Sequence, residues 1–160
     1  MFLIRLEKLN YRAINSSYMV GALAQRLKSF ETITPPSWAG FAKTAVFKQS
    51  LPQDPNWWYN RAASVLIKLS KNPALGTNKL SKEYGGRAIS TSKPHHAVKS
   101  SRKIIRTIVD QLEESNIIKT EGSNKLITAD GEKLLNEVGK QVIEQIKQEE
   151  PRLAIYDWNF

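Results

Sequence analysis

Residues 54–73 read DPNWWYNRAASVLIKLSKNP, and the order of residues in this stretch decides the fold. Asp54 followed by Pro55 is typical of a helix N-cap with proline at the first helical position. Asn72 and Pro73 end the same helix. Helical spacing predicts a buried stripe formed by Trp58, Ala62, Val65, Leu66 and Leu69. A neighbouring, partly basic stripe is formed by Trp57, Arg61, Ser64 and Lys68.

A short helix and then a basic helix are predicted downstream. The short helix covers 79–84, with Thr77 or Asn78 as its cap and the glycine pair 85–86 as its end. After a polar loop over 87–93, Pro94 starts a helix that runs to about Asn116. Its predicted apolar stripe is Ala97, Ile104, Ile105, Ile108 and Leu112. Its opposite face carries Lys99, Arg102, Lys103 and Arg106.

A small hairpin and a long helix complete the carboxyl-terminal part of the chain. Strand-like segments over 117–120 and 125–128 flank the turn sequence EGSN. Thr128 then caps a helix that Pro151 ends. The inward positions of this helix are Leu134, Leu135, Val138, Val142 and Ile146. Helix, short helix, basic helix and hairpin, in this order, are typical of a winged helix, a variant of the helix-turn-helix.

The amino-terminal part is expected to pack on this core as two more helices. Asn15, Ser16 or Ser17 caps the first, and Pro35 and Pro36 separate it from the second. The apolar positions of the first helix are Met19, Val20, Leu23 and Leu27, and the second presents Trp38, Phe41, Ala42 and Ala45. The predicted fold class is therefore mainly α: a winged-helix core with a small β-hairpin wing and packed amino-terminal and carboxy-terminal helices.

The length of 160 residues favours one domain. We expect an amino-terminal extension over 1–14, a single domain over 15–150 and an apolar tail over 151–160. The tail has five apolar side chains within eight residues, from Leu153 to Phe160. It either folds back onto the protein's own helices or docks on a neighbouring protein, and the sequence leaves both alternatives open.

Positive charge is concentrated in the middle of the chain. Residues 57–106 hold 11 basic side chains and one carboxylate, Glu83, whereas residues 107–160 hold 6 basic and 11 acidic side chains. Basic side chains without nearby acids repel one another until an external polyanion neutralises them. This segregation therefore predicts a phosphate-binding surface, and a merely solubilising lysine-rich face is the alternative.

The residue types needed for catalysis, metal binding or membrane insertion are missing from the pattern. The chain has no cysteine, and Glu83 has no second carboxylate nearby in the sequence with which to share acid–base chemistry. His95 and His96 are adjacent, so they cannot both face one metal from a helix. No apolar run approaches the roughly 18 residues that cross a bilayer. We therefore predict no enzyme, cofactor, metal site, small-molecule substrate or membrane association, and a location inside the cell.

The two adjacent tryptophans of residues 54–73 are expected to differ. Trp58 shares the apolar stripe, which predicts a core position. Trp57 shares the stripe of Arg61 and Lys68, where it either packs at the rim of the core or stacks on a base or covers a sugar.

Read in order, these segments resemble the nineteenth small-subunit ribosomal protein family of eukaryotes and archaea, which is unrelated to the bacterial protein of the same number. The resemblance runs from about Ser16 to about Lys147. The stretches that carry it are Pro35-Pro36-Ser37-Trp38 with Lys43, residues 54–64, Tyr84-Gly85-Gly86-Arg87, residues 94–99 and 106–113, and Lys125-Leu126-Ile127-Thr128 with Gly131.

The resemblance implies a helical, non-catalytic protein with a winged-helix core that binds small-subunit ribosomal RNA in the subunit head, beside neighbouring ribosomal proteins, and is needed for subunit maturation. It implies a cytoplasmic, ribosomal location, and the nucleolus during assembly in a eukaryote. It places Arg61, Arg87, His96, Lys99, Arg102 and Arg106 on the RNA-facing surface, Trp57 near that surface, and Trp38 among the amino-terminal helices. With the charge pattern, the expected RNA-binding set is Lys43, Lys48, Trp57, Arg61, Lys68, Lys79, Lys82, Arg87, Lys93, His96, Lys99, Arg102, Lys103 and Arg106.

Two other functions fit parts of the pattern. A winged-helix DNA-binding regulator shares the helix order, but its recognition helix normally carries base-reading Asn or Gln, where this face is nearly all Lys and Arg. A protein-interaction module would use the acidic carboxyl-terminal helix, and its binding would persist at high salt.

Overall fold

The computed structural model describes residue 11 and residues 14–73, 75–88, 92, 94–122 and 124–149. Most of the expected amino-terminal extension, the apolar tail and Pro151 therefore lie outside the described residues.

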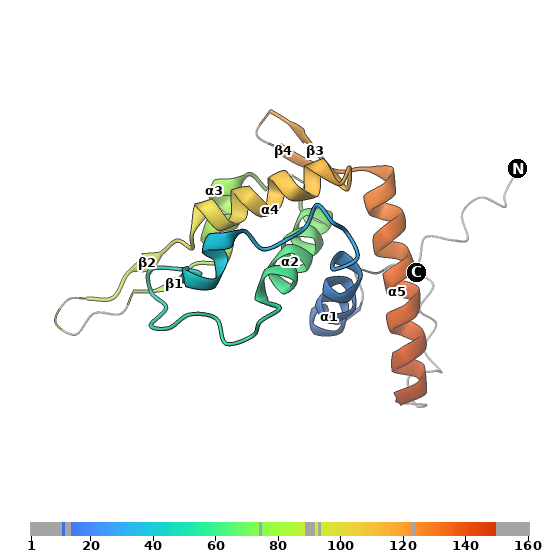
Figure 1. The fold of residues 1–160 in the computed structure, drawn as a ribbon, viewed down its shortest axis with the longest axis horizontal. Helices are drawn as coiled ribbons and strands as arrows, with labels where there is room; N and C mark the ends of the chain where they lie inside the picture. Colours follow the sequence, from blue (N-terminus) through green and yellow to red (C-terminus); the bar gives the residue numbers. More distant parts are fainter. Residues whose placement is uncertain are drawn as a thin grey trace, which may run out of the picture.

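The described chain is mainly helical, and its winged-helix core confirms the predicted fold class. Its helices are α1 (Ser16–Leu27), the 3₁₀ helix η2 (Ser37–Phe41), α2 (Trp57–Lys71), α3 (Thr77–Glu83), α4 (Arg102–Glu114) and α5 (Ala129–Glu149). Its strands are β1 (Gly86–Arg87), β2 (Ala97–Val98), β3 (Ile118–Glu121) and β4 (Asn124–Ile127). Helix α1 packs against both α2 and α5, and the β1–β2 pair lies at the end of the molecule opposite α5 (Figure 1). The wing pairs Ile118 with Ile127 and Glu121 with Asn124 in an antiparallel register.

Trp58 of α2 is the largest fully buried side chain and joins three segments. Only 1% of its surface is exposed. Its indole Nε1–H donates to Oε1 of Gln111 on α4 at 3.0 Å, and Gln111 Nε2 donates to the carbonyl oxygen of Thr34 at 2.6 Å. The ring of Trp38 packs edge-on against it, with the ring centroids 5.7 Å apart. The prediction that Trp58 belongs to the core is confirmed.

Helix α2 begins two residues later than the Asp-Pro signal predicts. Its N-cap position is Asn56, and the Asp54 carboxylate acts from two residues further upstream. Asp54 Oδ1 accepts the backbone N–H of Asn56 at 2.8 Å, while Oδ2 accepts from Nδ2 of Asn60 at 2.6 Å. Pro55 therefore occupies a turn before the helix instead of its first position.

The basic helix α4 begins at Arg102, so the prediction of a helix from Pro94 was wrong. Ala97 and Val98 instead form β2, which pairs with Gly86 and Arg87. The chain is held in this extended form because Ala88 N–H donates to the His96 carbonyl at 2.9 Å and Ser100 N–H to that of Ser81 at 2.9 Å. As a consequence Ala97 is exposed instead of buried, and Lys99 precedes the basic helix instead of lying on its face.

The predicted apolar face of the second helix is also partly wrong. Ala39 is buried and Trp38 is half-buried, but Phe41 is 86% exposed. The reason is that η2 ends at Phe41 and the chain is already extended at Ala42, so the helical periodicity assumed for this face stops there. Ala45 is buried because it forms an isolated antiparallel bridge with Ser100, not because it is helical.

The glycine pair after α3 is required by close packing instead of by a left-handed turn. Neither Gly85 nor Gly86 has a positive φ angle. A Cβ at Gly85 would lie 2.6 Å from the Val98 carbonyl oxygen, and one at Gly86 would lie 2.6 Å from the Phe47 ring. The start of α3 also differs from the prediction, because Gly76 is its N-cap residue and Thr77 is already helical.

The wing is fastened to the helices at both ends. After α4, Asn116 has a φ of 56°, and the N–H of Ile117 donates to the carbonyl of Leu112 at 3.1 Å, which is a Schellman ending. The hydroxyl of Thr120 donates to the Glu113 carboxylate at 2.8 Å and its N–H donates at 3.2 Å, which together lower the pKa of Glu113. Thr128 Oγ1 accepts the N–H of Gly131 at 3.2 Å, so the predicted cap of α5 is confirmed. All five inward positions predicted for α5 are buried.

The adjacent tryptophans predict very different effects on stability. Trp58→Ala removes a fully buried aromatic ring and should lower the free energy of unfolding by about 3–5 kcal/mol. Trp57 is half-buried, so Trp57→Ala should lower it by about 1 kcal/mol. Urea unfolding followed by circular dichroism measures both, and equal losses would contradict the assignment of the two rings.

Two helical glycines offer a matched test of packing. A Cβ at Gly131 would meet the Ile117 carbonyl oxygen and would lie 2.7 Å from Cγ2 of Ile127, whereas one at Gly21 meets nothing within 4 Å. Gly131→Ala should therefore lower the free energy of unfolding by about 1–3 kcal/mol through overpacking. Gly21→Ala should raise it by about 0.5–1 kcal/mol, because alanine favours a helix interior. Thermal melts of both variants check the signs, and a stabilising Gly131→Ala would refute the tight contact between α5 and the wing.

Candidate nucleic-acid interface

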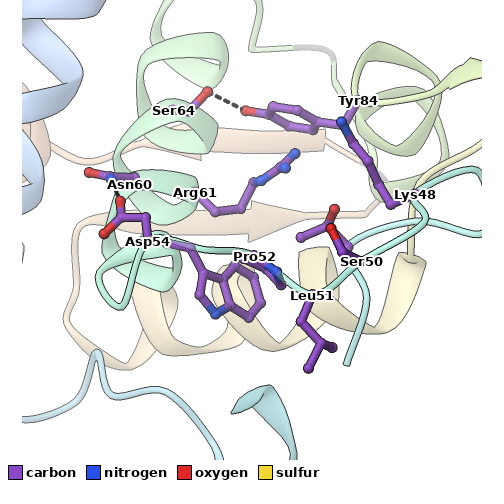
Figure 2. A pocket seen from close by; sticks show the side chains of 11 residues that line it. Lys48, Ser50, Leu51, Pro52, Asp54, Asn60, Arg61, Ser64 and Tyr84 are labelled. Atoms are coloured by element: carbon purple, nitrogen blue, oxygen red, sulfur yellow. Dashed lines mark hydrogen bonds between the residues drawn. The ribbon is translucent and has the colours of Figure 1, made fainter. Parts of the chain in front are cut away.

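A pocket of about 520 Å³ opens between α2, the carboxyl end of α3 and the loop before α2 (Figure 2). Helix α2 contributes Trp57, Asn60, Arg61 and Ser64, and α3 is followed at once by Tyr84. The remaining lining residues come from the loop: Thr44, Lys48, Ser50, Leu51, Pro52 and Asp54. This pocket brings together three residues predicted from the sequence, Lys48, Trp57 and Arg61.

Arg61 is a partly buried cation that packs against an aromatic ring. Its guanidinium carbon lies 4.2 Å from the centroid of the Tyr84 ring, and burial lowers the pKa of Arg61 from its ordinary value. No carboxylate of the described residues lies within ion-pair distance of it. Because arginine stays protonated in proteins, Arg61 keeps a positive charge that forms no direct ion pair within the described chain.

Tyr84 holds this cation in place. Its hydroxyl is hydrogen-bonded to the Ser64 hydroxyl at 2.7 Å, and burial raises the pKa of Tyr84, so the ring stays neutral under physiological conditions. Lys68 Nζ also lies 4.7 Å from the ring centroid and forms an ion pair with Glu83 at 3.1 Å. The one carboxylate of residues 57–106 is therefore engaged by Lys68, which leaves the charge of Arg61 in surplus.

Asp54 and Trp57 form other parts of the pocket lining. Both carboxylate oxygens of Asp54 already accept hydrogen bonds from Asn56 and Asn60, so this acid is committed to the start of α2. The Trp57 ring packs edge-on against Trp58, with centroids 5.3 Å apart. Trp57 therefore packs against the core through Trp58 and also lines the pocket.

A second group of cations gathers at the amino end of α3. Lys99 Nζ donates to Oδ1 of Asn78 at 2.9 Å. Arg102 and Arg106 of α4 line a hollow of about 280 Å³ together with Thr77 and Asn78. A seven-residue helix is about 10 Å long, so the two basic groups lie at opposite ends of α3. Lys99 thus joins Arg102 and Arg106 although it lies outside α4.

The other residues that the sequence predicts to bind RNA lie outside these two basic groups. Lys103 is exposed on α4 and lies over the Trp38 ring, with Nζ 4.8 Å from its centroid. Lys82 and Lys99 line one further hollow with the glycine pair, and Arg87 and His96 line another with His95. Lys43 and Lys79 are exposed, and Lys93 lies outside the described residues.

Tyr84 and Asn78 are the site residues that the sequence analysis missed as such. Tyr84 stands directly before the glycine pair, and an aromatic residue at a helix end beside two basic residues of α2 is only visible once the helices are packed. Asn78 was noted as a cap of α3, whereas its side chain holds Lys99. Neither role leaves a local pattern in the sequence.

The arrangement suits binding of an anion. The two carboxylates nearest the basic groups, Asp54 and Glu83, are both engaged. Among the described residues, no three His, Cys, Asp or Glu side chains come together as a candidate metal site. In the same part of the chain, no helix has both the length and the apolar character needed to cross a bilayer.

Comparison with known proteins gives a consistent result. The family model described as Ribosomal protein S19e matches residues 10–145. A small ribosomal subunit protein eS19 of Aeropyrum pernix is 34% identical over 150 residues, which cover 92% of this chain and 98% of that protein. The protein of the same name from Thermoplasma volcanium is 33% identical over 86% of this chain and 92% of its own length. That of Oryza sativa subsp. japonica is 38% identical over 68% of this chain and 74% of its own.

The matched region includes every described helix and strand except the last four residues of α5, and both basic groups lie within it. The resemblance noted from the sequence is thereby confirmed, and the chain belongs to the ribosomal protein S19e family.

Proposed function

We propose that this chain is a structural constituent of the small ribosomal subunit that binds ribosomal RNA in the subunit head and supports assembly of the subunit and maturation of its RNA. The relatives are named as small ribosomal subunit proteins, and the family is one of ribosomal proteins and not of enzymes. The observation that carries the RNA-binding role is the surplus of basic side chains around α3. Neighbouring proteins of the subunit head are the proposed protein partners, and the ribosome is the proposed location.

The proposed mechanism is neutralisation of phosphates where RNA segments converge. Arg61 and Lys48 at one end of α3, and Lys99, Arg102 and Arg106 at the other, provide two separate cationic contacts on one protein body. Each releases counterions from the RNA, which supplies most of the affinity. Because α4 packs against both α2 and α3, we expect the two contacts to set the distance between the RNA segments that they bind. The domain proposed to do this is residues 15–150, with all site residues within it.

The DNA-binding regulator is less well supported. The exposed face of α4 carries Arg102, Lys103 and Arg106, which suit phosphate contacts, and its Gln111 is committed to Trp58 and Thr34. No amide side chain on α4 is therefore left to read bases in a major groove. The family also favours RNA over DNA, because it is described as a family of ribosomal proteins.

Charge reversal on α4 tests the proposed function. Arg102→Glu combined with Arg106→Glu should leave the fold intact, because both side chains are exposed. Binding to small-subunit ribosomal RNA should weaken at least tenfold at physiological salt. Each phosphate contact that is lost should also flatten the plot of log affinity against log salt by roughly 0.7–0.9. Filter binding over a salt series measures both quantities.

The matched control reverses two exposed lysines of the acidic half, Lys140→Glu with Lys147→Glu, which changes the net charge by the same amount. The control should keep most of the affinity and the whole slope. Equal losses in both double variants would mean that only net charge matters, and an unchanged slope in the α4 variant would contradict the proposed contact.

A further inference from the structure

The pocket of Figure 2 has two chemically different walls. One wall is cationic: Arg61 extends from α2 toward Tyr84, and Lys48 lines the pocket from the loop. The apolar part of the lining, called the apolar wall below, consists of Trp57, Leu51 and Pro52. Leu51 is 44% exposed and the Trp57 ring is half-buried, so this wall is accessible from solvent.

The cationic wall points to an anionic group within the pocket and not merely beside it. Arg61 is withdrawn from solvent over the Tyr84 ring and has no carboxylate within ion-pair distance among the described residues. Asp54 lines the same pocket, but its carboxylate accepts from Asn56 and Asn60 at the start of α2 and lies outside ion-pair distance of Arg61. An unpaired, partly desolvated guanidinium is costly unless a ligand anion completes it.

The size and the apolar wall specify what carries the anion. A volume of about 520 Å³ falls within the usual range of pockets for small ligands, about 300–1,000 Å³. A base inside a duplex is stacked on both faces and cannot enter such a pocket, whereas an unpaired base can be splayed out and stacked on an aromatic side chain. The Ser64 and Tyr84 hydroxyls, which are hydrogen-bonded to each other at 2.7 Å, line the pocket on the side of the Arg61 guanidinium.

We infer that this pocket holds one unpaired nucleotide of the bound RNA, with its base on the Trp57 wall and its phosphate on Arg61 and Lys48. The inference rests on the proposed function and makes it more specific, because α4 then contacts backbone phosphates while the pocket selects an RNA with an extruded nucleotide. Trp57 determines this selectivity and Arg61 anchors the phosphate. An acidic peptide also matches the cationic wall, and the experiment below distinguishes it from RNA.

Two pools of blunt-ended RNA duplexes, each annealed from two separate strands so that no hairpin loop is present, test the inference with the full chain. One pool is fully paired, and the other has the same duplexes with a single unpaired nucleotide at varied positions. The wild-type chain should bind the bulged pool about tenfold more tightly, which is the usual value of stacking one base on an aromatic residue. Trp57→Leu should abolish this preference and leave binding to the paired pool unchanged. Trp57→Phe keeps an aromatic face and should retain most of the preference, which guards against a folding defect of the leucine variant.

Two further variants separate the possible outcomes. Tyr18→Leu alters an exposed aromatic residue of α1 outside the pocket and should change neither affinity. Arg102→Glu with Arg106→Glu should weaken both pools equally and keep their ratio. Equal affinity of the wild type for the two pools would overturn the nucleotide pocket and leave RNA binding intact. Failure to bind either pool would overturn the proposed function together with it. Binding of an acidic peptide that is lost in Arg61→Gln and kept in Arg102→Glu with Arg106→Glu would assign the pocket to a peptide instead.

Discussion

The hydrogen bond from the Trp58 indole to Gln111 joins the two helices that carry the basic side chains of the binding surface, α2 and α4. Gln111 in turn donates a hydrogen bond to the Thr34 carbonyl oxygen, in the segment after α1. Trp38 and Trp57 both pack edge-on against the Trp58 ring. One buried ring thereby sets the position of the basic helix on one side and of the pocket-lining indole on the other, so the core fixes the geometry of the binding surface.

The packing around α2 and α3 also explains how the fold tolerates a surface with far more basic than acidic side chains. Eleven basic side chains and one carboxylate between Trp57 and Arg106 work against stability, because like charges repel in the free protein. Glu83 compensates Lys68, and Tyr84 supplies Arg61 with a ring face in place of an acid. The fold therefore tolerates the surplus through packing and leaves the charge of Arg61, Arg102 and Arg106 available to an external polyanion. In our proposal, ribosomal RNA supplies the missing negative charge.

Elements with strong local signals could be predicted from the sequence, and those made by distant pairing could not. Periodic apolar residues predicted α2 and α5, and the Thr128 cap predicted the start of α5. Strand-like segments on either side of a turn predicted the wing. The late start of α4 was missed because Ala97 and Val98 pair with Gly86 and Arg87, and nothing in residues 94–101 reports that partner. The basic residues were likewise visible, but the stacking of Arg61 on Tyr84 depends on how α3 meets α2. The sequence predicts the composition of the site, and packing determines its shape.

The most direct test of the central claim is electron cryomicroscopy of small ribosomal subunits that contain this chain. We expect the surface of α2, α3 and α4 to face ribosomal RNA, with Arg61, Arg102 and Arg106 within ion-pair distance of phosphates. A structure in which this surface faces solvent, while the chain is held in the subunit through α5 or through the wing alone, would contradict it.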